Sequence, residues 1–310
     1  SSSDGGITWT ATLTPDAAVD EATNVVTLTN TGVTDAAGNT GLGTTSSNNY
    51  AIDSAAPSVV SVSVPADTTY VAGQALTFTV NTSENVTVDT TGGTPQLSLT
   101  IGATSRNAAF ASGSGTSALV FSYTVQAGDF DDDGIVVGTL SANSGTLKDA
   151  AGNDMTLTLN AIADTSGVLV DAVLPALVSL SPADDATGVT PSANLVITLD
   201  EDIALGAGTI AVYDSDDVLF ASIDVTSHGG QVSINGAALT IDLSANLIED
   251  VSYYVLVDGG AITDLAGNAF AGIAGPTSWS FAVADISPPA VTAITVAGSP
   301  AASAAAIQFT

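Results

Sequence analysis

Cysteine is absent from the 310 residues of the chain. Disulfide bonds and thiolate metal sites are therefore excluded. A small extracellular β-domain without disulfides needs another source of stability, and a bound metal ion is a common one. Long hydrophobic runs are also missing, because the longest apolar stretches have only the length of a β-strand. We therefore expect no segment that inserts into a membrane.

Basic residues are almost absent: Arg106 and Lys148 stand against 32 acidic residues, which gives a formal net charge of −30. Such a chain repels phosphate backbones and anionic lipids, so neither nucleic acid nor a membrane surface is expected as a partner. Of the acidic residues 28 are Asp and only four are Glu. Asp is the short carboxylate that suits turns and loops around hard cations. The bias indicates Ca²⁺, and adaptation to a salty habitat is the alternative.

Aromatic residues make up 5% of the chain, and His228 is the only histidine. A lone histidine without cysteine cannot form a histidine-based zinc site, and a catalytic triad would need its loop to be buried and oriented. Sugar-cleaving clefts usually need aromatic platforms as well. Trp9 and Trp279 both fall in predicted strands, where we expect core residues. The sequence predicts no catalytic residues and no enzyme.

The residues that are abundant favour an all-β fold. Thr and Val suit half-buried pleated surfaces, and Gly, Asn and Asp supply turns. Short alternating runs stand about 8–12 residues apart with turn residues between them, the rhythm of an all-β sandwich. The prediction is a linear array of tandem immunoglobulin-like Greek-key β-sandwiches.

An internal repeat sets the domain boundaries. The pattern D-x-A-G-N occurs at Asp35, Asp149 and Asp264, with spacings of 114 and 115 residues. An acidic residue shortly before proline recurs with spacings of 118 and 114 residues, at Asp53, Asp171 and Asp285. A unit of about 115 residues matches the size of an immunoglobulin-like sandwich. We predict the back half of one repeat at 1–54, complete repeats at 55–173 and 174–286, and the start of another at 287–310.

Two stretches resemble known families. The span 175–283 contains the stretches Leu180–Val189, Leu195–Glu201, Tyr253–Val255, Ile262–Asn268 and Trp279–Phe281. On these residues it is similar to the bacterial Ig-like domain of surface-layer proteins. The first complete repeat contains Ala56–Val59, Thr82–Val86, Tyr123–Asp129 and the D-x-A-G-N element. On these residues it resembles the Ig-like repeats of giant bacterial adhesins and biofilm-associated proteins. The resemblances imply an extracellular spacer, often with calcium within or between repeats.

The stretch Asp129–Gly134 fits D-x-D-x-D-G, the opening of a calcium loop. Alternate carboxylates, here Asp129, Asp131 and Asp133, would converge on one cation, and the glycine permits the turn behind them. A helix–loop–helix calcium site would close with Glu at position twelve, where Leu140 stands, so the closing ligand must come from elsewhere. Asp149 or Asp171 could serve, and a solvated acidic loop is the alternative.

The D-x-A-G-N elements are expected first as turns, because Asn and Gly tolerate left-handed backbone and Asp caps its own turn. A ligand role for their Asp is the second interpretation. The linker acids, among them Asp53 and Asp171, fall where two repeats meet. A cation bound there would fix the angle between the repeats.

These features favour a structural spacer of a large extracellular bacterial adhesin, surface-layer or fibre-forming protein, stiffened by calcium at the cell surface. The expected partners are neighbouring repeats of the same chain, with self-association into a fibre or layer as a further option. The alternatives are a carbohydrate- or protein-binding Ig-like module and the accessory domains of a secreted hydrolase. The sequence has no signal peptide, starts in mid-pattern and stops inside an apparent strand, so a fragment of a longer protein is expected.

Overall fold

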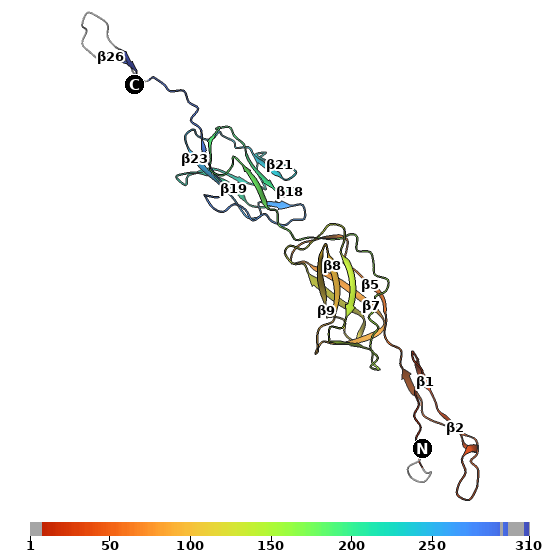
Figure 1. Cartoon of the computed structure of the whole chain (residues 1–310). Helices are drawn as coiled ribbons and strands as arrows, with labels where there is room; N and C mark the ends of the chain where they lie inside the picture. Colours follow the sequence, from red (N-terminus) through yellow and green to blue (C-terminus); the bar gives the residue numbers. More distant parts are fainter. Residues whose placement is uncertain (1–7, 292–293, 297–306, 310) are drawn as a thin grey trace, which may run out of the picture. The chain divides into compact units, whose positions relative to one another are not determined.

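The computed structural model describes residues 8–291, 294–296 and 307–309 (Figure 1). Within these residues nearly every regular element is a β-strand, and the one helical element is a 3-10 turn, η1 (Asn30–Gly32). The chain forms two compact units that divide between Val173 and Leu174. The predicted all-β fold is confirmed.

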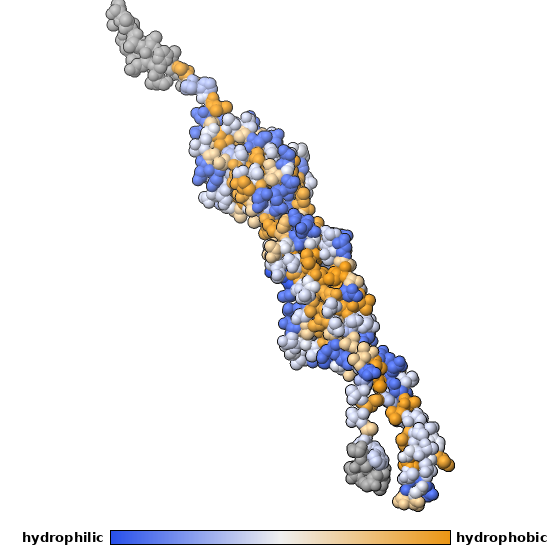
Figure 2. Space-filling view, turned by 45° about the vertical axis from the view of Figure 1, so that its right-hand side comes forward, coloured by the Kyte–Doolittle hydropathy of each residue, from blue (hydrophilic) through white to orange (hydrophobic). Residues whose placement is uncertain are grey.

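The N-terminal segment of the first unit consists of two short antiparallel sheets. Strand β1 (Asp20–Asn24) pairs with β4 (Tyr50–Asp53), and β2 (Thr27–Thr29) pairs with β3 (Thr44–Ser46). Hydrophobic residues lie on the surface of this segment (Figure 2), and the Trp9 side chain is 72% exposed. The expectation that Trp9 is a core residue is wrong. Among the described residues, this segment contributes no side chain to either buried core cluster.

The rest of the first unit is a β-sandwich around one core. Its larger sheet has the order β12-β8-β9-β10-β7-β13, with β5 also paired to β7, and its smaller sheet has the order β11-β14-β6. The larger sheet contains β5 (Val59–Ser63), β7 (Ala75–Asp89), β8 (Gln96–Ile101), β9 (Thr104–Ser112), β10 (Thr116–Thr124), β12 (Val136–Ser141) and β13 (Thr146–Lys148). The smaller sheet contains β6 (Thr68–Tyr70), β11 (Phe130–Asp131) and β14 (Val168–Asp171).

The core of this sandwich follows from the alternation along its strands. In β7 the side chains of Leu76, Phe78 and Val80 are buried while the residues between them face outward. Successive side chains of a strand point to opposite faces, so this period of two covers one face of the sheet with apolar groups. Strand β10 supplies the neighbouring row with Leu119 and Phe121, which are fully buried.

The second unit is also a β-sandwich. One sheet has the order β15-β17-β22-β21, the other has the order β16-β25-β23-β19-β20, and β18 pairs with β24. The first sheet contains β15 (Leu177–Ser181), β17 (Leu195–Leu199), β21 (Val232–Asn235) and β22 (Ala238–Ile241). The others are β16 (Ala186–Val189), β18 (Ile203–Leu205), β19 (Thr209–Asp214), β20 (Leu219–Asp224), β23 (Ser252–Val257), β24 (Ile262–Asp264) and β25 (Ser280–Val283).

Trp279 belongs to the second core, as predicted, although it lies just before β25 and not within a strand. Its side chain is fully buried, and its indole Nε1 donates a hydrogen bond to the carbonyl of Pro182 at 2.8 Å. A buried tryptophan needs a partner for its one polar atom, and this bond provides it. Towards the C-terminus, β26 (Ile294–Val296) pairs with β27 (Ile307–Phe309). Most of the expected repeat start at 287–310 beyond Val291 lies outside the described residues.

Candidate metal centre

The turn that follows β13 positions the first carboxylate of the candidate site. Asp149 Oδ1 accepts hydrogen bonds from the backbone N–H groups of Gly152 and Asn153, at 2.7 and 2.8 Å. The Asn153 side-chain amide donates to Asp149 Oδ2 at 2.7 Å. Gly152 has a φ of 98°, which a residue with a side chain rarely adopts. The D-x-A-G-N sequence therefore folds into a turn closed by its own Asp and Asn.

The same turn occurs at the other two copies of the motif. Asp35 Oδ1 accepts from the N–H of Asn39 at 2.8 Å, and Asp264 Oδ1 accepts from the N–H of Asn268 at 2.7 Å. In both copies the Asn side chain donates to the second carboxylate oxygen. The predicted turn role is confirmed in all three copies.

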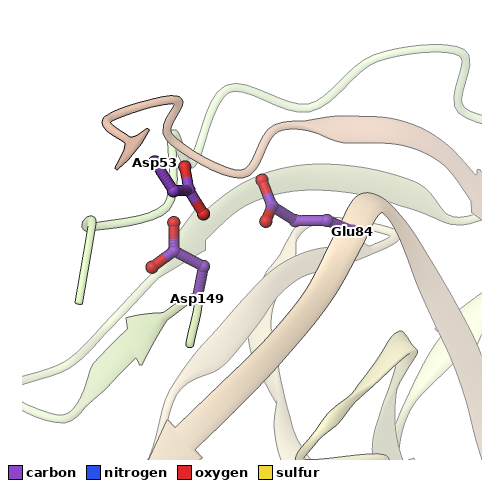
Figure 3. Close-up of side chains that lie close together, drawn as sticks. All are labelled: Asp53, Glu84 and Asp149. Carbon is purple, nitrogen blue, oxygen red and sulfur yellow. The ribbon is translucent and has the colours of Figure 1, made fainter. Parts of the chain in front are cut away.

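Three carboxylates meet above the turn at Asp149 (Figure 3). Asp53 at the end of β4, Glu84 within β7 and Asp149 each offer one oxygen, and these oxygens lie within 4.8 Å of one another. Asn153 Nδ2 also lies 3.4 Å from Asp53 Oδ1 and 3.3 Å from the Asp53 carbonyl, so the turn contacts the linker directly. The structure therefore brings together two residues that the sequence predicted as metal ligands, Asp53 and Asp149.

Glu84 is the member of the group that the sequence did not predict. It lies at an irregularity of β7, where the pairing with β10 shifts between Asn81 and Val86. The hydroxyl of Thr82, which is buried, donates to the Glu84 carbonyl at 2.6 Å and holds this bulge. A bulge re-aims the side chain next to it. The sequence signal for this position is the Glu itself, in a chain whose acidic residues are nearly all Asp.

The electrostatics of the group reflect unbalanced negative charge. Burial raises the pKa of Glu84, and repulsion from Asp149, Asp53 and Asp20 raises it further. Burial alone would also raise the pKa of Asp149, but the hydrogen bonds from Asn153 and Gly152 outweigh it and lower that pKa. Both basic residues of the chain form ion pairs with other carboxylates. Among the described residues, these pairs are Arg106–Asp129 and Lys148–Asp154.

The arrangement suits a hard cation. Ca²⁺ takes six to eight oxygen ligands at about 2.3–2.6 Å, so two oxygens on opposite sides of one ion are about 4.8 Å apart. The three carboxylate oxygens satisfy that limit, and Asp53 and Glu84 keep contact with solvent, from which water ligands can come. Mg²⁺ demands a tighter octahedron and keeps more of its water. The residues present therefore fit Ca²⁺.

The loop Asp129–Gly134 has a different arrangement from the predicted calcium loop. The buried Asp129 carboxylate accepts hydrogen bonds from Arg106 Nη2 at 2.6 Å, from Arg106 Nε at 2.9 Å and from the Tyr123 hydroxyl at 2.5 Å. Gln126 N–H adds a fourth bond at 2.9 Å. Arg106 therefore supplies the positive charge that a metal ion was expected to supply, and no sequence pattern indicated this pairing.

Asp131 is also buried, and it bonds to backbone groups. Its Oδ2 accepts from Gly102 N–H at 2.6 Å and its Oδ1 accepts from Gly134 N–H at 2.8 Å, so it joins the loop to the end of β8. Asp133 is exposed. Among the described residues Asp129, Asp131 and Asp133 do not form a group of converging carboxylates.

The remaining predicted ligand, Asp171, is the last residue of β14, and its carboxylate accepts from Val173 N–H at 3.2 Å. In the second unit Glu201 and the buried Asp264 offer carboxylate oxygens within 4.8 Å of each other. These residues follow Glu84 and Asp149 by 117 and 115 positions. The Glu–Asp pair of the first centre thus recurs at the period of the repeat.

Two solved structures that match this chain are distantly similar to it. CopC from Methylosinus trichosporium OB3b matches 37% of this chain and 99% of its own, with 13% identity and a TM-score of 0.27. The fibronectin(III)-like modules of CbhA from Clostridium thermocellum match 72% of this chain and 94% of their own, with 15% identity and a TM-score of 0.21. No curated protein matches the chain.

Comparison with models of protein families identifies two segments of the chain. Bacterial Ig-like domains are typically extracellular or surface-exposed, and such families are typically non-catalytic. The described part of the chain has no helix long and apolar enough to cross a membrane. Residues 1–52 match one family described as a bacterial Ig-like domain, and residues 171–283 match a second family with the same description. Two segments of the chain, 1–52 and 171–283, are therefore similar to bacterial Ig-like domains.

Proposed function

We propose that this chain is a spacer region of a large extracellular bacterial adhesin, surface-layer or fibre-forming protein, and that Ca²⁺ stiffens it. The Ig-like domains support a structural role outside the cell. Its proposed partners are neighbouring repeats of the same chain, and further copies of the chain where it assembles into a layer or fibre.

The observation that carries the calcium part is the group Asp53, Glu84 and Asp149. These residues come from three segments that are far apart in the sequence, and no positive side chain balances them among the described ion pairs. One bound Ca²⁺ would relieve their repulsion and tie β4 to the β7 bulge and to the turn after β13. Movement of the N-terminal segment relative to the sandwich would then have to break the bonds between Ca²⁺ and its ligands.

Thermal unfolding of the full chain tests this proposal, with Ca²⁺, with chelator, with Mg²⁺ and at matched ionic strength. A ligand that binds the folded state at a hundred times its Kd stabilises it by about 2.7 kcal/mol. In an Ig-like domain of about 115 residues, this stabilisation corresponds to a rise in Tm of about 10 °C or more. We expect this rise with Ca²⁺ and a much smaller one with Mg²⁺.

Two variants locate the effect. Glu84→Gln keeps the shape of the side chain but removes its charge, so we expect most of the calcium-dependent rise in Tm to disappear. Asp133→Asn removes one charge from the exposed acidic loop, and we expect it to keep the full rise. An equal response of both variants, or a rise no larger than matched salt gives, would refute the centre while leaving the Ig-like fold intact.

A sugar- or protein-binding role is the second candidate. A solvent-facing aromatic cluster would favour it, and the sequence alone shows no such cluster. In the second unit, however, Tyr213 and Tyr254 stack with ring centroids 5.3 Å apart and both remain partly exposed.

A further inference from the structure

A pocket of about 210 Å³ opens on the outer face of the five-stranded sheet in the second unit. Its lining includes Ser252 of β23, Ser280 and Ala282 of β25, and Asp185 and Thr187 at the edge strand β16. Ser252 and Ala282 face each other in register, and Ser280 lies two residues before Ala282 on the same face. The floor is therefore made of small side chains, which leave room above the sheet.

The path of β16 forms the wall of this pocket. β16 pairs with β25 at Ala186↔Phe281 and again at Val189↔Val283, with an irregularity between the two pairs. Gly188, within that irregularity, has a φ of 71°, and Asp185 has a φ of 58° just before the strand. Left-handed backbone in an L-residue such as Asp185 costs energy, so contacts around it must hold it in place. The wall of the pocket is therefore formed by β16 and the residue before it.

Those contacts also orient two carboxylates beside the pocket. The backbone N–H of Ser280 donates to Asp184 Oδ1 at 2.8 Å, and its hydroxyl lies 3.2 Å from the same oxygen and 3.0 Å from Asp185 Oδ1. The Asp185 N–H donates to the Ser280 carbonyl at 2.7 Å. Each carboxylate keeps lone pairs that can accept from a ligand, and the hydroxyls of Ser252 and Thr187 can both donate and accept.

An aromatic ring lies next to Ser280 of the pocket, although it is not among the residues that line the pocket. Tyr254 pairs in register with Ser280, so both side chains emerge on the same face of adjacent strands. One face of the Tyr254 ring stacks on Tyr213 with an interplanar angle of 13°, and its hydroxyl donates to Asp217 at 2.9 Å. The stack and the hydrogen bond hold the ring in one orientation before any ligand arrives. Binding would therefore lose little side-chain entropy at this residue.

The ligand must match small apolar groups, hydroxyls, fixed carboxylates and an aromatic ring. Anions are repelled by Asp184, Asp185 and the net charge of −30. A metal ion would need further carboxylates, and none converges on this pair among the described residues. A polyhydroxyl ring meets every demand, because its hydroxyls donate to carboxylates while its C–H faces contact Ala282 and an aromatic ring. We propose that this pocket binds one neutral sugar unit, free or as part of a polysaccharide.

This inference is independent of calcium, so its test does not depend on the proposed metal centre. Ligand-observed saturation-transfer NMR on the full chain would use glucose, galactose, mannose and N-acetylglucosamine, each at millimolar concentration. Affinity electrophoresis in dextran and galactomannan gels would cover polysaccharides. We expect saturation of at least one sugar or retardation in at least one gel. A gel shift without NMR binding of the free sugar assigns the polymer as the source of the sugar unit.

Matched variants place the binding in the pocket. Ala282→Leu fills the floor and should weaken binding about tenfold or more, whereas Ser222→Leu, on the exposed outer face of β20 and outside the pocket, should leave it unchanged. Tyr254→Phe keeps the ring and should bind better than Tyr254→Ala. Circular dichroism would verify that each variant is folded. Absence of binding to every sugar and polymer, or equal binding by the Ala282→Leu and Ser222→Leu variants, overturns the proposal.

Discussion

At the scale of single residues, the two basic side chains have different roles. Arg106 reaches a fully buried carboxylate, that of Asp129, while its own side chain is 32% exposed. Lys148 pairs with Asp154, whose side chain is 79% exposed. Removing one partner of a buried pair leaves a charge without compensation, whereas an exposed pair contributes little. The arginine should therefore matter far more to stability than the lysine.

Arg106→Met tests this difference. The variant leaves the Asp129 carboxylate buried with only Tyr123 and Gln126 as polar partners, so we expect a loss of about 3 kcal/mol in the free energy of unfolding. The matched variant Lys148→Met should lose less than about 1 kcal/mol. Urea unfolding at pH 7 measures both. Similar losses for the two variants would show that the arginine does not stabilise Asp129 in the way its contacts indicate.

The same carboxylate predicts a pH dependence. Burial of Asp129 opposes its ionisation, but hydrogen bonds from Arg106 and Tyr123 outweigh burial and lower its pKa below 3.8. A folded-state pKa below the unfolded value gives stability that is present above the unfolded pKa and is lost as pH falls through the folded pKa. We therefore expect the free energy of unfolding to decline as pH drops below about 4.

Asp129→Asn serves as the comparison for this decline. The variant should be less stable than the native chain at pH 7, and the difference between the two should shrink as pH falls. Equilibrium unfolding at several pH values between neutral and about 2.5 measures it. A difference that stays constant over this range would exclude Asp129 as a source of the acid sensitivity.

At the scale of elements, the D-x-A-G-N turn is the unit that the chain reuses. Its glycine takes a φ of 90°, 98° and 97° in the three copies, at Gly38, Gly152 and Gly267. A Cβ added at each of these glycines would meet nothing within 4 Å. The requirement for glycine is therefore conformational and not steric.

Gly152→Ala should cost about 1–2 kcal/mol of stability, because an L-residue resists this backbone conformation even in open space. Gly32 is the matched control, since a Cβ there also meets nothing within 4 Å and its φ is not positive. Gly32→Ala should change stability by less than about 0.5 kcal/mol. Thermal unfolding of the two variants measures the difference. Equal effects would mean that the turn relaxes to accept alanine.

At the scale of the whole molecule, the net charge of −30 opposes every compact state of the chain. Monovalent salt screens repulsion between exposed charges beyond about 10 Å at 0.1 M. We therefore expect Tm to rise as NaCl increases from a few millimolar to about 0.15 M in the presence of chelator. The Glu84→Gln variant should show the same salt response as the native chain, which separates general screening from the metal centre. A Tm that does not respond to salt would contradict a general charge penalty.

Local sequence determined much of this protein. Alternation such as Leu76, Phe78 and Val80 fixes which face of a strand is buried, because side chains alternate with a period of two. The turn at Asp149 was predictable because the hydrogen bonds that close it lie within five residues. The repeat period, the absence of cysteine and the scarcity of basic residues likewise follow from the chain alone, and they set the class of fold.

Only the tertiary structure decided where the charges meet. Asp129 was expected to bind a cation and instead pairs with Arg106, 23 residues away. Arg106 lies on β9, and Asp129 lies in the loop after β10, the strand that pairs with β9. Glu84 joins Asp53 and Asp149 through a bulge, and Tyr213 meets Tyr254 through strand register. Trp9 is exposed although its local pattern reads as a strand. Local patterns encode the direction of a side chain within its own element, whereas its partners depend on pairing and register between elements that are distant in the sequence.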